Sequence, residues 1–156
     1  MVAPLENKTS RASYLTISTR DLGPRQVDEE AVISFPTGLP GFEDYRRFVL
    51  LQYPFPTPLV CLQCIDRPEV AFVVTDPVNL VADFKLTPGN SDLPEWRGED
   101  PKDIKVLVIL TIPPGCPRDL TANLMAPLVI NLRTRRGRQV VVDKGGYSSK
   151  HPVLVK

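Results

Sequence analysis

Short apolar runs, broken by prolines, glycines and charged residues, recur along this chain of 156 residues. Runs of about four to eight residues predict β-strands, because the amphipathic helices of globular proteins need longer segments with apolar residues three and four positions apart. The predicted strands cover residues 14–18, 31–33, 48–51, 59–65, 70–75, 106–112, 128–132 and 140–142. Eight or so short strands with turn signals between them favour a mainly all-β fold, a closed or nearly closed β-barrel.

Two short segments are the only candidates for helical turns. Residues 43–47 can form about one turn before the strand at 48–51, and Asp100 followed by Pro101 resembles a helix N-cap with proline in the first helical position. The apolar run at 106–112 is continuous, so we expect that strand to be buried on both faces.

The segment 121–142 predicts a β-hairpin with a cationic tip. Its first strand is apolar from residue 128 to residue 132, and its second consists of the three valines at 140–142. Gly137 lies between them and is expected to take the positive φ that a tight turn requires. The basic residues of this turn are Arg133, Arg135, Arg136 and Arg138.

Composition is that of an ordinary globular protein, with an apolar fraction of 42% and a charged fraction of 24%. A chain of this length buries enough surface to fold without a metal or a disulfide. We expect a disordered extension at 1–12 and a single domain at 13–156. No apolar run approaches the roughly 20 residues of a membrane span, and the N-terminus lacks a signal-peptide core, so we expect a cytoplasmic protein without membrane association.

The net charge of +1 conceals an uneven distribution. From Arg133 onward, seven lysines and arginines face a single acidic residue, Asp143. A basic region of this kind can bind phosphate or an acidic partner, and the alternative is a solvated turn with a loose terminus.

The sequence offers little catalytic chemistry. His151 is the only histidine, so the common catalytic triads lack a well-placed base. Cys61 and Cys64 form a C-x-x-C motif, but within a strand residues three apart point to opposite faces, which favours small buried side chains over a disulfide or a zinc site. No phosphate-binding glycine motif is present. We therefore expect no enzyme activity, no cofactor and no metal.

Five blocks of the sequence carry a family resemblance. They are ISFPTGLPGFEDYRRFVLL at 33–51, AFVVTDP at 71–77, VLVILTIP at 106–113, TANL-APLVIN-RRG-QVV within 121–142, and YSSKHPV at 147–153. In this order, and over roughly residues 17–153, they closely resemble the flagellar assembly factor family FliW. The chain differs from the family pattern in its N-terminal extension, its proline-rich segment 53–58 and its loop 88–103.

The resemblance implies a small antiparallel β-barrel with one or two short helical turns. It also implies a cytoplasmic bacterial regulator without catalytic activity, which binds newly made flagellin and the RNA-binding translational repressor CsrA. On this expectation, free protein keeps CsrA from the flagellin messenger RNA, and flagellin reverses this by capturing the protein. A monomer is the simplest expected state.

The resemblance also suggests a partner-binding surface, centred on the basic hairpin and the end of the strand at 70–75. The alternative for its two asparagines is that they satisfy local backbone groups. The expected partner-binding residues are Asp76, Pro77, Asn123, Pro127, Asn131, Arg133, Arg135 and Arg138.

An alternative function is that of a small β-barrel single-stranded RNA-binding protein acting through the same basic hairpin. Such barrels combine basic loops with aromatic stacking platforms, and here only Tyr147 follows the hairpin. Direct binding of nucleic acid is therefore not expected.

Overall fold

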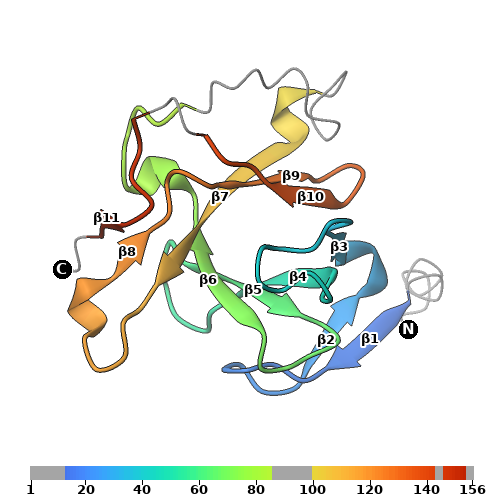
Figure 1. Ribbon diagram of the computed structural model, residues 1–156. Helices are drawn as coiled ribbons and strands as arrows, with labels where there is room; N and C mark the ends of the chain where they lie inside the picture. Colours follow the sequence, from blue (N-terminus) through green and yellow to red (C-terminus); the bar gives the residue numbers. More distant parts are fainter. Residues whose placement is uncertain (1–12, 86–99, 143–145, 154–156) are drawn as a thin grey trace.

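Seven strands of this protein close into a barrel, as the ribbon of the computed structural model shows (Figure 1). The structure describes residues 13–85, 100–142 and 146–153. The strands are β1 Tyr14–Ile17, β2 Arg25–Asp28, β3 Ile33–Ser34, β4 Arg47–Gln52, β5 Val60–Cys64, β6 Ala71–Thr75, β7 Ile104–Thr111, β8 Thr121–Ala122, β9 Leu128–Asn131, β10 Arg136–Gln139 and β11 His151–Pro152. Short 3₁₀ turns lie at η1 Glu29–Ala31, η2 Pro77–Asn79, η4 Pro101–Asp103 and η5 Pro117–Asp119.

The barrel closes at β7, which pairs with three strands. Around the barrel the order is β7, β6, β5, β4, β3, β10 and β9, and β9 pairs with β7 again. Residues 104–107 of β7 pair with β9, while residues 110–111 pair with β8 on the same edge. β11 extends the sheet beyond β8, and β1 and β2 form a separate hairpin. The predicted mainly β fold with a barrel is confirmed.

One barrel pairing runs parallel. β3 and β10 meet through the single register pair Ser34 and Arg136, whereas the remaining pairings of the sheet are antiparallel. β3 contains two residues, so this junction depends on neighbouring contacts more than on its own ladder.

Alternation along the strands produces one apolar layer inside the barrel and two outside it. The inner layer holds Phe35, Phe48 and Leu62, together with residues from β3, β6, β7 and β9. The β1–β2 hairpin and the chain beside it cover an outer cluster that includes Ile17 and Cys61. A second outer cluster lies on β7 and β8, its buried members being Val108, Leu110, Leu120, Ala122 and Leu124.

The two cysteines of the C-x-x-C motif lie in β5 on opposite faces. Cys64 belongs to the inner layer and Cys61 to the outer cluster beneath the β1–β2 hairpin. Both are buried and both are free thiols. The interpretation of these cysteines as small buried side chains is confirmed.

Thiol reactivity should follow this burial. Removal from water is the largest cause that raises the pKa of both Cys61 and Cys64, so less thiolate is present at a given pH. Cys116 is exposed. We expect one thiol to react rapidly with Ellman's reagent at pH 8 in the folded protein and the other two only after denaturation. Three rapidly reacting thiols, or a disulfide-linked form, would contradict this placement.

Several predicted boundaries are wrong in detail. The valines at 140–142 follow β10 rather than forming the second hairpin strand, and residues 43–47 form no helical turn. Ala31 lies in η1, where the Asp28 carboxylate accepts a hydrogen bond from the Glu30 amide at 2.8 Å. β7 is buried on both faces only in its middle, and Ile112 beyond its end is 50% exposed. The predicted extension at 1–12 and most of the loop at 88–103 lie outside the described residues.

Candidate partner-binding site

The turn of the basic hairpin is organised by Asn131, the last residue of β9. Its side-chain oxygen Oδ1 accepts hydrogen bonds from the amides of Arg133 at 2.9 Å and Thr134 at 3.0 Å. Its own carbonyl accepts the amide of Arg135 at 2.8 Å. Asn131 is 1% exposed, so it holds the turn from beneath. The alternative interpretation of this asparagine, that it satisfies local backbone groups, is confirmed.

Arg135 fixes the turn to the neighbouring part of the barrel. It is the residue with positive φ, at 59°. Its guanidinium donates to the carbonyl of Ala31 at 2.6 Å, and its carbonyl accepts the amide of Ser34 at 2.8 Å. Contacts to residues about a hundred positions earlier in the chain make this turn a rigid part of the barrel wall.

Gly137 serves a purpose other than the predicted one. It lies inside β10 and is buried, and the positive φ of the hairpin belongs to Arg135 instead. A Cβ atom at Gly137 would lie 2.8 Å from the ring of Phe35 and 3.2 Å from Ile130. Glycine is needed here because the Phe35 ring fills the space that a side chain would take.

The arginines of β10 point away from the barrel interior. Since Gly137 faces Phe35 inside, Arg136 and Arg138 on either side of it face outward. Register places Arg136 beside Ser34 of β3, and Ser34 beside Arg47 of β4. Arg136 is exposed and Arg138 is half-buried. With exposed Arg133 at the turn, these residues form an outer cationic surface, named here the arginine face: Arg133, Arg136 and Arg138.

The other expected residues lie on either side of β7. The Oδ1 of Asn123 accepts the amides of Met125 at 3.2 Å and Ala126 at 3.0 Å, which shapes the bend between β8 and β9. Pro127 at the end of this bend is buried, and its carbonyl accepts the amide of Val140 at 2.9 Å. Beyond β6, the Asp76 carboxylate accepts the amide of Val78 at 3.0 Å and caps η2, with buried Pro77 in the first position.

Burial divides the expected residues by role. Pro77, Pro127 and Asn131 are buried, and Asn123, Asp76 and Arg135 use their side chains to order the local backbone. Arg133 and Arg138 are the expected residues whose side chains turn to the outer surface. Arg136 also has an outward side chain, although the sequence placed it only in the basic turn and not among the expected partner-binding residues. The assignment of these residues to a partner surface remains a prediction.

Replacing Asn131 with alanine should destabilise the fold by about 1–2 kcal/mol, because the amides of Arg133 and Thr134 lose their acceptor at a buried position. Urea denaturation measures this loss, and Thr134→Ala in the same turn, at an exposed position, serves as control. An unchanged free energy of unfolding would mean that the turn holds without its asparagine.

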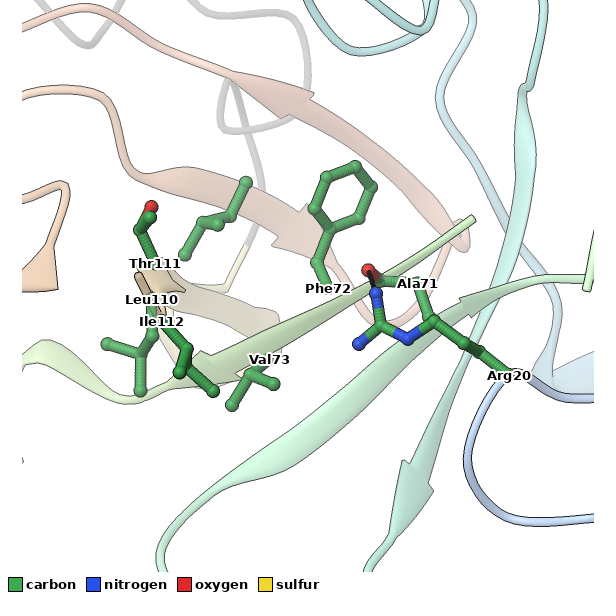
Figure 2. A pocket seen from close by; sticks show the side chains of 8 residues that line it. Arg20, Ala71, Phe72, Val73, Leu110, Thr111 and Ile112 are labelled. Atoms are coloured by element: carbon green, nitrogen blue, oxygen red, sulfur yellow. Dashed lines mark hydrogen bonds between the residues drawn. The ribbon is translucent and has the colours of Figure 1, made fainter. Parts of the chain in front are cut away.

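A groove that the sequence did not reveal lies on the outer face of the barrel. Two hollows of about 370 and 380 Å³ share Arg20, Val73 and Ile112, so they lie side by side and together form the groove. Figure 2 shows the guanidinium of Arg20 beside Ala71, with the side chains of Val73 and Ile112 on the same side of the strands and Phe72 on the other. The second hollow is completed by Asp21, Leu22, Tyr53, Phe55 and Leu59.

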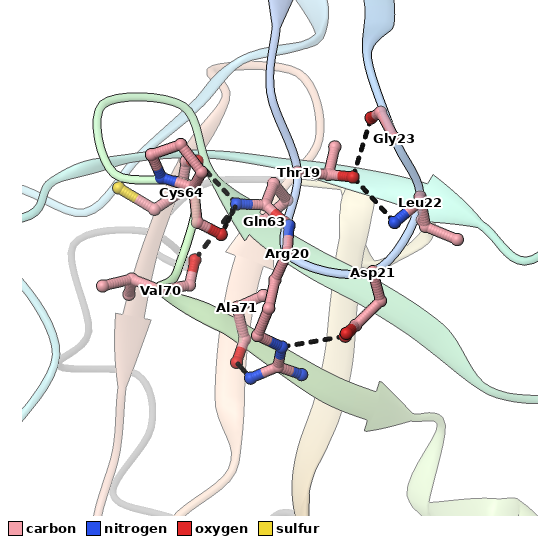
Figure 3. Close-up of polar contacts among 10 residues, drawn as sticks. Thr19, Arg20, Asp21, Leu22, Gly23, Gln63, Cys64, Val70 and Ala71 are labelled. Atoms are coloured by element: carbon pink, nitrogen blue, oxygen red, sulfur yellow. Dashed lines mark hydrogen bonds and ion pairs between the residues drawn. The ribbon is translucent and has the colours of Figure 1, made fainter.

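A polar network anchors the loop that bears Arg20 (Figure 3). The amide of Arg20 donates to Oε1 of fully buried Gln63 at 3.0 Å, and Nε2 of Gln63 donates to the carbonyls of Cys64 and Val70. The Arg20 guanidinium donates to the Ala71 carbonyl at 2.8 Å and to the Asp21 carboxylate at 2.8 Å. These hydrogen bonds therefore fix the position of the loop relative to β5 and β6.

Tyr53 stacks on Phe55 at the edge of this groove, with ring centroids 5.5 Å apart. Burial raises the pKa of Tyr53 to about 12, with a smaller contribution from Cys61. The phenol stays neutral at physiological pH and can act as a hydrogen-bond donor there.

Within residues 13–85, 100–142 and 146–153, no three histidine, cysteine, aspartate or glutamate side chains gather in a way that could hold a metal ion. The same residues include no helix long and apolar enough to span a membrane.

The fold and the site define a small closed β-barrel with a rigid basic hairpin on its wall. Residues 16–154 match the model of the FliW protein family, and the chain belongs to that family. It is 33% identical over 140 residues to flagellar assembly factor FliW of Natranaerobius thermophilus, covering 90% of this chain and 93% of the relative. It is 39% identical over 132 residues to the FliW of Pseudothermotoga lettingae, covering 85% and 84%.

A solved structure leads to the same family. The crystal structure of a flagellar assembly factor FliW superposes with a TM-score of 0.81 at 32% identity, covering 91% of this chain and 99% of the other. The resemblance inferred from the five sequence blocks is confirmed. The family is named for flagellar assembly and not for an enzymatic activity.

Proposed function

We propose that this protein is a cytoplasmic, non-enzymatic regulator of flagellar assembly that binds the translational repressor CsrA and, in exchange, flagellin. Membership of the FliW family supports a role in flagellar assembly through protein partners. The particular partners are those that the sequence resemblance suggested. As a monomer with two protein partners, it relieves repression of flagellin translation while flagellin is scarce.

The observation that carries the proposal is the rigid presentation of the arginine face. The hairpin turn is fixed by Asn131 from beneath and by the bond of Arg135 to Ala31. Side chains on an ordered surface lose less conformational freedom when they bind. The family resemblance implies that CsrA interacts through acidic C-terminal segments, and three outward arginines complement that charge.

Exchange of one partner for the other requires surfaces that overlap or are coupled. The proposed surface includes the arginine face and extends across β7 towards Asp76 at the end of β6. On a barrel of this size, two protein partners that bury ordinary areas would compete for neighbouring strands.

The test is a change in hydrodynamic size. Purified protein, CsrA from the same organism and flagellin are analysed alone and in mixtures by size exclusion with light scattering. We expect a complex with CsrA that flagellin dissociates. Co-migration of all three proteins in one complex would contradict the exchange, and no complex with either partner would contradict the proposed function.

For the alternative function, binding of single-stranded RNA, the described part of the chain presents no exposed aromatic stacking surface at the hairpin. The aromatic ring next to β10 is Phe35, which is fully buried beneath Gly137. Base stacking supplies much of the affinity of such barrels for single strands.

A further inference from the structure

The ladder between β6 and β7 ends before either strand does. Its last register pair is Val73 with Leu110, which leaves Ala71 in β6, Thr111 at the end of β7 and Ile112 just beyond it without partners across the gap. The first hollow is lined by these same residues. The groove therefore begins where two neighbouring strands separate.

Backbone groups of both strands face this opening. The Cys64 amide donates to the Val70 carbonyl at 2.9 Å, so alternation turns the amide and carbonyl of Ala71 towards β7. The Ala71 carbonyl accepts its hydrogen bond from the Arg20 side chain in place of a strand. No hydrogen bond among the described residues involves the amide of Ile112. The backbone groups at this opening are therefore placed to form hydrogen bonds with an extended polypeptide segment.

The floor and rim of the groove are mainly apolar, and its charged residues are Arg20 and the Asp21 that pairs with it. Phe55 is 57% exposed and Ile112 is 50% exposed, and half-buried Val73 lies between the two hollows. Arg20 is the basic residue common to both hollows, and its side chain is 40% exposed. Its bonds to Ala71 and Asp21 occupy Nη1 and Nε, which leaves donors of the guanidinium fork for a further acceptor.

We propose that this groove binds an extended segment of a partner protein in which a carboxylate side chain lies between apolar side chains. The carboxylate binds the guanidinium of Arg20, and main-chain carbonyls of the segment accept hydrogen bonds from the amides of Ala71 and Ile112. The apolar side chains contact Val73, Ile112 and the stacked pair Tyr53–Phe55. The groove is separate from the arginine face, so this inference does not depend on the proposed function.

The test uses nuclear magnetic resonance of the ¹⁵N-labelled full chain with two peptides. The probe is acetyl-Val-Glu-Val-Thr-Val-amide, and the control peptide carries lysine in place of glutamate. We expect saturable shifts of the Ala71, Val73 and Ile112 amides at millimolar peptide, with the lysine peptide binding at least about tenfold more weakly. No shifts, or equal binding of the two peptides, would overturn the inference.

Substitutions in and outside the groove distinguish specific peptide binding from non-specific charge attraction. Arg20→Gln should weaken binding of the glutamate peptide by about tenfold, whereas Arg118→Gln at an exposed position in η5 should not change it. Ile112→Ser removes an exposed apolar contact without touching the polar network of Arg20, and it should weaken both peptides. An effect of Arg118→Gln equal to that of Arg20→Gln would reduce the inference to non-specific charge attraction and overturn it.

The same amide resonances also test whether one of two other segments occupies the groove. Shifts of the groove amides on deletion of residues 1–12 would mean that the chain's own N-terminus occupies the groove. Shifts that grow with protein concentration in the absence of peptide would mean that a second copy does. Either result contradicts a partner segment as the occupant.

Discussion

Phe35→Ala is expected to lower the free energy of unfolding by about 3–5 kcal/mol, the largest loss among the single substitutions considered. Phe35 is fully buried and its ring meets Phe48 edge to face, with centroids 5.5 Å apart. The same ring lies against Gly137 of β10. Its removal opens a cavity where β3 and β10 join through a single register pair, so few ladder contacts remain to hold this junction together.

Urea denaturation followed by circular dichroism measures this loss. Phe55→Ala is the matched control, because Phe55 is 57% exposed and its removal should cost less than about 1 kcal/mol. Equal losses in the two variants would contradict the position of Phe35 in the inner layer. Since the arginine face rests on β10, Phe35→Ala should also weaken partner binding at temperatures where the fold is still mostly populated.

The double variant Arg133→Glu with Arg136→Glu is expected to weaken CsrA binding by about 2–4 kcal/mol. Both side chains are exposed on the arginine face, and reversing two charges opposite an acidic partner replaces attraction with repulsion. Arg135 is left intact because its guanidinium bonds to Ala31 and its replacement would disturb the turn itself. Calorimetry measures the affinity, and a thermal melt checks that the variant is folded.

The control for this double variant is Arg118→Glu with Lys150→Glu. It makes the same change in net charge at exposed residues outside the hairpin, near β8 and β11. Its affinity for CsrA should stay close to that of the parent protein at moderate salt. If both double variants lose affinity equally, the arginine face is not the binding surface, and net charge alone governs the interaction.

Sequence patterns predicted the strands with strong apolar signals. The predicted strands 59–65 and 70–75 agree closely with β5 and β6, because both segments are mainly apolar and the turn around Pro68 separates them. The first hairpin strand was also predicted, since β9 is a run of buried residues. In these segments local pattern and barrel packing favour the same structure.

The sequence prediction placed the second hairpin strand after β10, because neither face of β10 carries a row of apolar side chains. Its outward positions are arginines, and at its centre the position that faces inward is Gly137, whose missing side chain is replaced by the ring of Phe35. A contact between residues a hundred positions apart cannot be read from local alternation. The valines at 140–142 carried the stronger local signal and misplaced the strand.

For the candidate site, the structure bears out the alternative considered for Asn123 and Asn131, that these asparagines order nearby backbone. Their assignment to a partner surface stays a prediction. The groove at Arg20 was missed, because it depends on where the β6–β7 register ends and on a loop held by Gln63 from another part of the chain. Neither leaves a local signal in the sequence.

The central claim is exchange between two partners on one protein, and calorimetry tests it most directly. CsrA from the same organism is titrated into the purified protein at two salt concentrations, and then again after the protein has been saturated with flagellin. We predict sub-micromolar affinity that weakens at higher salt and is lost when flagellin is bound. CsrA binding of unchanged affinity in the presence of saturating flagellin would contradict the account.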